Sequence, residues 1–222
     1  MLIRPGGGEV IGDSPERRVE ILSDHPSLHA TWSRFGPGRE GADLHVHRRH
    51  TDLFYVLEGE LTVRLGLEGE EVVVPAGSVA RVPPMVVHGF RNGSDAEMRY
   101  LNFHAPGAGF ADYMRALRDG RSLTHDQEPP PAEGLRPAGD AVVASPPISI
   151  DAIAVSEAGE VSSGSSPDLE SFWVLDGEAA FTVGGDAFAA PAGSWVQIPP
   201  GSAFSVAGGA RLLSVRAPAG DR

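Results

Sequence analysis

The sequence predicts an all-β protein built from two copies of one antiparallel sandwich or barrel. Three observations predict it: short apolar or alternating runs separated by turn residues, a high content of glycine and proline, and an internal repeat. The chain has 28 glycines and 19 prolines among 222 residues, about a fifth of its length against roughly an eighth in average proteins. No collagen-like period or low-complexity tract accounts for the excess, so it indicates many tight turns and many short strands.

The first copy reads as a series of short strands between residues 26 and 104. Apolar or alternating runs of four or five residues lie at 53–57, 61–65, 71–74, 79–82 and 99–103. They are bounded by Glu-Gly-Glu, Pro-Ala-Gly, Pro-Pro and Asn-Gly segments, which are turn formers. Short runs at this spacing are typical of an antiparallel sandwich or barrel.

One segment departs from the strand pattern and is predicted to be a helix over 109–119. Its apolar residues recur at helical spacing, at Phe110, Tyr113, Met114 and Leu117. Gly120 then supplies a stop. We expect this helix to pack its apolar face on the barrel. Residues 120–147 contain three consecutive prolines and little periodicity, so they are predicted to connect two domains.

The internal repeat identifies the second domain. The segment Asp52–Glu60 reappears 118 residues later as Glu170–Glu178. Two further segments, 75–79 and 81–84, reappear with an offset of 116 as 191–195 and 197–200. The matching order and nearly constant offset predict two copies of one β-fold, the later copy having lost two residues.

Composition excludes several classes of function. The formal net charge is −12 and no basic patch occurs, so a nucleic acid is not expected as a partner. The chain has no cysteine, which excludes disulfides, thiol nucleophiles and zinc fingers. No apolar run approaches the roughly 18 residues that suggest a membrane span, and the first twenty residues contain no apolar signal region. These features predict a cytoplasmic protein that does not engage a membrane.

The residues that carry chemistry cluster in the first copy, where all eight histidines lie between positions 25 and 125. In a strand, His45 and His47 would project from the same face, and Asp52 follows shortly after. Two imidazoles and a carboxylate are three of the ligands that a divalent metal needs. His88 follows a Pro-Pro turn after the next predicted strands and could return to the same face as a fourth ligand.

These residues resemble the cupin superfamily, and more closely a bicupin of the quercetinase-like, cupin 2 conserved-barrel type. The first cupin motif has the form G-x5-H-x-H-x3–4-E-x6-G, and its last four positions correspond to His45, His47, Asp52 and Gly59. The second motif has the form G-x5-P-x-G-x2-H-x3-N, and it is matched by Gly77, Pro83, His88 and Asn92. The resemblance implies two tandem double-stranded β-helix, jelly-roll-like barrels with a short helix between them. It also implies one metal inside each competent barrel.

With this resemblance the expected domains are a first barrel with the metal site and trailing helix over 1–119, a connection over 120–147, and a second barrel over 148–222. In the second copy the ligand positions hold Ser163, Ser165, Glu170 and Phe204. These residues cannot assemble a comparable cage of nitrogen and oxygen ligands, so no metal is expected there. Its aromatic residues, Trp173, Trp195 and Phe204, are expected to fill the barrel interior.

The sequence departs from the cupin motifs at three positions. Asp52 replaces the usual glutamate and is one methylene shorter, so it could bind the metal directly, reach it through water, or act as a base beside a three-histidine site. Arg39 replaces the opening glycine of the first motif, and the nearest glycine is Gly41. Met85 replaces the inner glycine of the second motif, where its side chain could intrude on the pocket or merely pack.

The remaining histidines receive less specific expectations. His50 is expected to face solvent from a loop between two ligands. His104, at the end of a strand, is as compatible with a structural role as with lining the pocket. His25, His29 and His125 are assigned surface or turn roles.

The function implied is that of a metal-dependent cupin enzyme. A divalent transition metal (Fe, Mn, Ni, Co or Zn) at such a site can act as a Lewis acid or hold a substrate beside dioxygen. The quercetinase-like resemblance implies an oxidoreductase, a dioxygenase acting on a small phenolic, enolic or otherwise oxygen-rich molecule, with Asp52 as the base. Two alternatives stay open: a non-oxidative isomerase, lyase or hydrolase, and a small-molecule-binding cupin without catalysis. The two barrels are expected to pair within the chain, and a further homodimer stays open.

Overall fold

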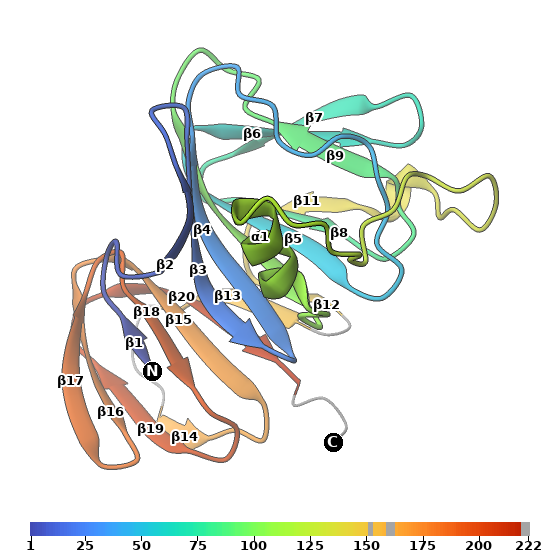
Figure 1. The fold of residues 1–222 in the computed structure, drawn as a ribbon. Helices are drawn as coiled ribbons and strands as arrows, with labels where there is room; N and C mark the ends of the chain where they lie inside the picture. Colours follow the sequence, from blue (N-terminus) through green and yellow to red (C-terminus); the bar gives the residue numbers. More distant parts are fainter. Residues whose placement is uncertain (151–152, 159–162, 219–222) are drawn as a thin grey trace. The chain divides into compact units, whose positions relative to one another are not determined.

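The computed structural model describes residues 1–150, 153–158 and 163–218. The chain divides into two compact units (Figure 1). The first unit comprises residues 9–145, and the second unit comprises residues 1–8 together with 146–222. Each unit carries two antiparallel β-sheets. The structure thus confirms the all-β class and the tandem β-barrel architecture.

The first unit is built from a seven-stranded sheet and a three-stranded sheet. Its strands are β2 (Glu9–Asp13), β3 (Arg17–His25), β4 (Leu28–Phe35), β5 (Thr51–Glu58), β6 (Glu60–Leu65), β7 (Glu70–Pro75), β8 (Val79–Val82), β9 (His88–Arg91), β10 (Met98–Ala105) and β11 (Val142–Ala144). The strand orders are β11-β8-β5-β10-β4-β3-β2 and β7-β6-β9. All five runs that the sequence analysis selected lie within strands, β5, β6, β7, β8 and β10.

The core of the first unit lies between its two sheets. Phe54 and Val56 of β5 belong to one apolar cluster with Leu61 and Val63 of β6, and none of the four side chains is more than 1% exposed. Burying each such side chain stabilises the fold by about 1.5–3 kcal/mol. This cluster fixes β5, the strand that carries Asp52, against the second sheet.

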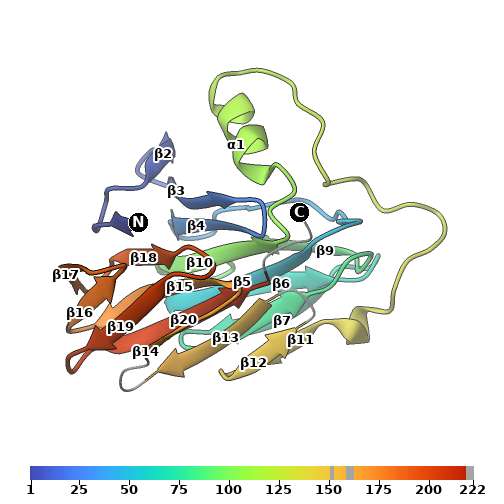
Figure 2. The ribbon, with the colours of Figure 1, turned by 90° about the horizontal axis from the view of Figure 1, so that it is seen from below.

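The helix α1 (Phe110–Arg118) confirms the prediction for 109–119. It packs against β2 and β3 (Figure 2), and its buried residues include Met114. Arg115 fastens the helix to the same two strands, because its guanidinium lies 2.7 Å from Glu9 Oε2 on β2 and 2.7 Å from Asp24 Oδ2 on β3.

Of the connection predicted over 120–147, residues 120–145 remain part of the first unit. Glu128 and Val46 exchange backbone hydrogen bonds of 2.9 and 3.0 Å, and the Arg136 N–H donates to the Met85 carbonyl. After the short 3-10 helix Ala138–Asp140, β11 pairs with the edge of β8. The segment therefore supplies partners to backbone groups that an uncovered edge would leave unpaired.

The second unit has a six-stranded and a four-stranded sheet. Its strands are β1 (Leu2–Ile3), β12 (Ile148–Ile150), β13 (Ile153–Ala158), β14 (Ser163–Ser165), β15 (Leu169–Asp176), β16 (Glu178–Val183), β17 (Asp186–Pro191), β18 (Trp195–Ile198), β19 (Ala203–Ala207) and β20 (Arg211–Ala217). The strand orders are β1-β18-β15-β20-β13-β12 and β14-β19-β16-β17. The amino terminus belongs here: Leu2 pairs with Val196, and the Met1 ammonium donates to the Gln197 carbonyl at 2.7 Å.

The repeat seen in the sequence is confirmed strand by strand. The hairpin β5–β6 corresponds to β15–β16, and β7–β8 corresponds to β17–β18. The two missing residues lie in one turn, because residues 66–69 join β6 to β7 whereas only Gly184 and Gly185 join β16 to β17. In the second unit Trp195 is fully buried, and Phe204 packs against an apolar cluster that contains Phe172 and Phe181.

Within the described ranges, no helix has the length and apolar character that crossing a bilayer requires.

Candidate metal centre

Four side chains that the sequence selected as ligands converge in the first unit. His45 and His47 precede β5, Asp52 lies on β5 and His88 begins β9. His45 and His88 are neighbours because their backbones form an antiparallel bridge, with N–H···O distances of 2.8 and 3.0 Å. All four side chains are buried, and each offers one ligand atom within 4.8 Å of the others. The group could therefore hold a metal ion.

Hydrogen bonds to backbone carbonyls orient the three imidazoles. Nδ1 of His45 lies 2.7 Å from the Asp43 oxygen, Nδ1 of His88 lies 3.0 Å from the Val86 oxygen, and Nδ1 of His47 bonds to the oxygen of Asp126. A carbonyl oxygen only accepts, so each Nδ1 carries the proton and each neutral ring is left with an unprotonated Nε2. This is the arrangement in which a second partner fixes the tautomer of a metal-binding histidine.

The Nε2 atoms face one another at short range. His45 Nε2 lies 3.1 Å from His47 Nε2, and Asp52 Oδ2 lies 3.3 Å from His88 Nε2 and 3.8 Å from His47 Nε2. With the protons on Nδ1, these contacts bring lone pairs and a carboxylate together without a donor between them. A divalent cation satisfies all of them, so the donor set fits a borderline transition metal.

Asp52 reaches the site although it is shorter than glutamate. Its second oxygen, Oδ1, accepts a hydrogen bond of 2.5 Å from Asn102 Nδ2 and lies 3.4 Å from His104 Nε2. Burial alone would raise the pKa of Asp52, but the interaction with His104, whose Nε2 faces Oδ1, leads the effects that hold that pKa well below its ordinary value. The carboxylate is therefore ionised, as a metal ligand must be.

The imidazoles of His45, His50 and His104, in contrast, are kept neutral. Burial lowers the pKa of His45 to about 3, with His88 and His47 adding to the effect. Burial is also the largest cause of the lowered pKa values of His50 and His104. A neutral imidazole is the form that binds metal.

Two expectations about the other histidines are wrong. His50 is fully buried instead of facing solvent, because the loop that carries it folds inward over Asp126. His29 is 1% exposed instead of lying at the surface, because it lies inside β4 opposite His104 in the β4–β10 pair. The sequence pattern around His29 and His50 gave no sign that either side chain would point into the barrel.

The remaining histidines divide between the pocket and a turn. His104 lines the cavity described below. His125 is half-buried and stacks on Tyr113 with ring centroids 5.0 Å apart, so its assignment to the surface or a turn is only partly met. His25 has the expected turn role, since its Nδ1 accepts the Ser27 N–H at 3.1 Å.

Asp126 is a site residue that the sequence reasoning missed. Its buried carboxylate accepts the backbone N–H groups of Arg48 and Arg49, both at 2.8 Å. Oδ2 of Asp126 also lies 3.0 Å from His50 Nδ1, and its carbonyl holds His47. One residue thus fixes the loop between two candidate ligands, and no motif marks it in the sequence.

A cavity of about 210 Å³ opens beside the four candidate ligands. Alternate residues of β3, β4 and β10 face it, and residues of α1 cover it. Its apolar lining includes Phe35, Phe90, Phe110, Tyr113 and Met114, and its polar lining includes Arg17, Thr31, Ser33 and Gln127. The cavity also exposes His45, His47 and Asp52, so a molecule bound in it would lie against the candidate metal ligands.

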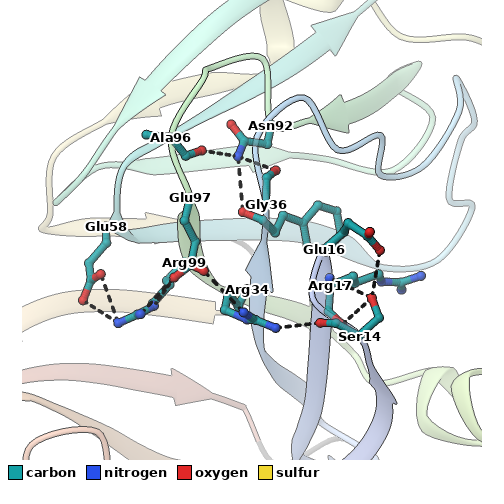
Figure 3. A network of polar contacts seen from close by, with 11 residues as sticks. Ser14, Glu16, Arg17, Arg34, Gly36, Glu58, Asn92, Ala96, Glu97 and Arg99 are labelled. Carbon is teal, nitrogen blue, oxygen red and sulfur yellow. Dashed lines mark hydrogen bonds and ion pairs between the residues drawn. The ribbon is translucent and has the colours of Figure 1, made fainter.

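Arg17 contributes a positive charge to the lining of this cavity. Its guanidinium carbon lies 5.5 Å from the ring centroid of Phe35, and its buried Nε has no hydrogen-bond partner. Within the described part of the chain, no carboxylate forms an ion pair with it. The backbone N–H of Arg17 is held separately by Ser14 Oγ at 3.1 Å (Figure 3).

Asn92, the last residue of the second motif, has a structural role (Figure 3). Its fully buried Nδ2 donates to the carbonyls of Phe35, Gly36 and Ala96 at 3.2, 2.8 and 2.7 Å. These bonds tie the end of β9 to the end of β4. They fix the strand that begins with His88.

Met85 occupies the glycine position of the second motif at a structural cost. Its φ is 65°, in the left-handed region that disfavours residues with a Cβ atom by about 1–2 kcal/mol. Its side chain does not line the cavity. Gly41, near the replaced first-motif glycine, is required, since a Cβ there would lie 2.4 Å from the Phe90 ring.

The second unit does not reproduce the site. Ser163 and Ser165 lie on β14, Phe204 lies on β19, and Glu170 on β15 is bonded to Arg216 at 2.8 Å. Among its described residues, no group of three histidine or carboxylate side chains converges as in the first unit.

Residues 31–104 match the family model of the cupin domain. The first unit therefore contains a cupin domain. Quercetin 2,3-dioxygenase of Bacillus subtilis (strain 168) is 28% identical to this chain over 120 residues, which are 53% of this chain and 34% of that protein. The chain thus spans about a third of the length of this curated relative.

Solved structures share the fold of this chain over nearly its whole length. Protein Ylba from E. coli has a TM-score of 0.71 at 14% identity, with 100% of this chain and 91% of that chain covered. Oxalate decarboxylase of B. subtilis has a TM-score of 0.57 at 16% identity, with 97% and 76% covered. At these identities the likeness shows the fold alone.

Proposed function

We propose that the first unit is a metal-dependent dioxygenase that acts on a small phenolic or enolic molecule. One divalent transition metal (Fe, Mn, Ni, Co or Zn) would be held by His45, His47, Asp52 and His88. The observation that carries the proposal is the convergence of these four buried ligand atoms at the wall of an aromatic-lined cavity. The similarity to quercetin 2,3-dioxygenase supports the oxidative reaction.

A bound divalent ion would acidify a coordinated hydroxyl group and hold it beside dioxygen. The chain's own residues provide the rest. Asp52 Oδ2 points at the imidazoles and is placed as a ligand, while Asn102 holds Oδ1. In the alternative role Asp52 accepts the proton of the substrate hydroxyl. The next group in the path of that proton would then be His104, whose Nε2 lies 3.4 Å from Asp52 Oδ1.

The cavity favours a compact aromatic or enolic substrate. Its aromatic side chains, Phe35, Phe90 and Tyr113 among them, offer faces and edges on which a planar ring packs. The volume of about 210 Å³ lies below the roughly 300–1,000 Å³ of common ligand pockets. A single ring therefore fits better than a three-ring flavonol. The apolar side of α1 keeps water away from the bound molecule.

Arg17 would select an anionic substrate. Its guanidinium lies within the same cavity and has no carboxylate partner among the described residues. A carboxylate or phenolate on the substrate would complete this pair by charge-assisted hydrogen bonds. We therefore include in the proposal an acidic group on the substrate, away from the oxygen that meets the metal.

Oxygen uptake tests the proposal. The protein loaded with iron, manganese, nickel or cobalt is incubated with single-ring phenols and enols, each with and without a carboxylate, in an oxygen electrode. We expect oxygen consumption to match substrate loss and to be absent in His47→Ala, with His25→Ala as the control. Substrate loss without oxygen would instead establish a non-oxidative Lewis-acid enzyme. Binding without any turnover would establish a binding protein.

A further inference from the structure

A second cluster of histidines lies next to the candidate metal centre and shares one residue with it. His47, His50 and His104 each offer one ligand atom within 4.8 Å of the others. Their ring centroids are 4.0 Å apart for His47 and His50, 4.7 Å for His50 and His104, and 5.6 Å for His47 and His104. None of the three is more than 2% exposed.

Three of the six ring nitrogens of this cluster lack a hydrogen-bond partner. Neither ring nitrogen of His50 has a hydrogen bond, and Nδ1 of His104 has none. Leaving a buried polar atom unpaired costs about 1–3 kcal/mol, and a native structure normally compensates such atoms with water or an ion. An ion is the partner that several converging imidazoles would share.

Asp126 prepares His50 for this role. Its carboxylate is fixed by the backbone N–H groups of Arg48 and Arg49, and its Oδ2 lies 3.0 Å from His50 Nδ1, although outside hydrogen-bonding geometry. A small rotation of the ring would let Nδ1–H donate to Asp126 and leave Nε2 free. A carboxylate behind an imidazole in this way orients and strengthens a metal-binding histidine.

The two clusters cannot both be complete at once. His47 belongs to each, and its Nδ1 is committed to the carbonyl of Asp126. Only Nε2 remains, and its one lone pair can bind one ion. We propose that His47, His50 and His104 form a second position for the metal, overlapping the first, so that one ion occupies either place. The inference rests on the proposed metal binding by the first unit.

The second position differs in the ions it prefers. It offers three neutral nitrogens, whereas the first adds the carboxylate of Asp52. Imidazole nitrogens suit Ni²⁺, Cu²⁺ and Zn²⁺, and carboxylates suit harder ions such as Mn²⁺. Nickel is therefore the appropriate probe, and the first position is expected to bind it more tightly.

Titration of metal-free full-length protein with Ni²⁺ tests the overlap. Calorimetry gives the affinity, and equilibrium dialysis with elemental analysis gives the stoichiometry. The wild type is expected to bind one ion per chain. His88→Ala removes a ligand of the first position only, so it should still bind one ion, about 10–100-fold more weakly. His88→Ala with His50→Ala, and His47→Ala alone, leave neither position complete, so both should bind more weakly than His88→Ala.

The matched control is the double variant His88→Ala with His25→Ala, which should bind Ni²⁺ as His88→Ala does. Thermal melting followed by circular dichroism verifies that each variant is folded. His45→Ala provides a second route to the same result if His88→Ala does not fold. Two ions per wild-type chain would overturn the overlap. So would a folded His88→Ala that binds none, or a double variant that binds as well as His88→Ala. A wild type that binds no ion would instead refute the proposed metal-dependent function.

Discussion

Replacing Asp126 by asparagine tests whether a residue outside both cupin motifs builds the metal centre. The carboxylate accepts two backbone N–H groups at 2.8 Å, those of Arg48 and Arg49, and lies behind His50. An asparagine keeps the shape but presents an NH₂ group to one of these donors. The loop between His47 and Asp52 would then lose one of its two anchors.

The magnitude follows from these contacts. A hydrogen bond to a charged group contributes about 1.5–3 kcal/mol, and the two N–H groups are only partly buried. We therefore expect Asp126→Asn to lower the free energy of unfolding by about 1–3 kcal/mol. Misorientation of the neighbouring imidazoles should weaken metal binding about 10–100-fold, as is typical when a group behind a ligand is removed.

Urea denaturation and Ni²⁺ titration provide the two readouts. Glu128→Gln is the matched control, because Glu128 lies on the same segment and its pair with Arg48 is half-exposed on both sides. An exposed pair contributes about 0–1 kcal/mol, and this one does not touch the ligands. If Asp126→Asn bound Ni²⁺ as tightly as Glu128→Gln, the positioning argument would be refuted.

Three further predictions concern pH, backbone strain and substrate charge. Because burial lowers the pKa of His45 to about 3 from about 6.5 in the unfolded chain, the unfolded chain binds more protons between these values. Metal-free protein should lose stability as pH falls below 6.5, by up to about 1.4 kcal/mol per pH unit for each such histidine; a flat dependence between pH 6.5 and 4 in urea titrations would contradict this. Met85→Gly, which relieves a φ of 65°, should change the free energy of unfolding by about 0 to +1 kcal/mol, and a loss above 1 kcal/mol would show that the side chain packs usefully. Arg17→Met should weaken benzoate binding to metal-loaded protein about tenfold or more while leaving benzamide unchanged, and calorimetric titrations showing equal losses for both would refute an anion site.

The sequence was sufficient for the fold and for the four candidate ligands, because both depend on local patterns. Alternation and turn residues mark β5 to β8 and β10, and the repeat marks their counterparts in the second unit. The two sequence motifs contain the four candidate ligands, and one backbone bridge between His45 and His88 brings the motifs together. Alternation, turn residues and motif spacing can be read from a single sequence because each involves residues that lie close together in the chain.

Features that depend on distant contacts could not be predicted. Leu2 and Ile3 form a two-residue strand whose partners lie almost 200 positions away, and a strand so short has no periodicity. Asp126 lies in a segment without pattern, and its importance comes only from folding against residues 47–50. His29 and His50 were misplaced because polarity suggested solvent, whereas the barrel interior retains a row of neutral imidazoles.

The metal content of the protein tests the central claim most directly. Protein purified without added metal, and again after reconstitution, is analysed by elemental mass spectrometry beside His47→Ala. The account predicts about one transition-metal ion per wild-type chain and a lower content in the variant, since His47 belongs to both clusters. A wild type without metal even after reconstitution, or a variant with the same content as the wild type, would contradict it.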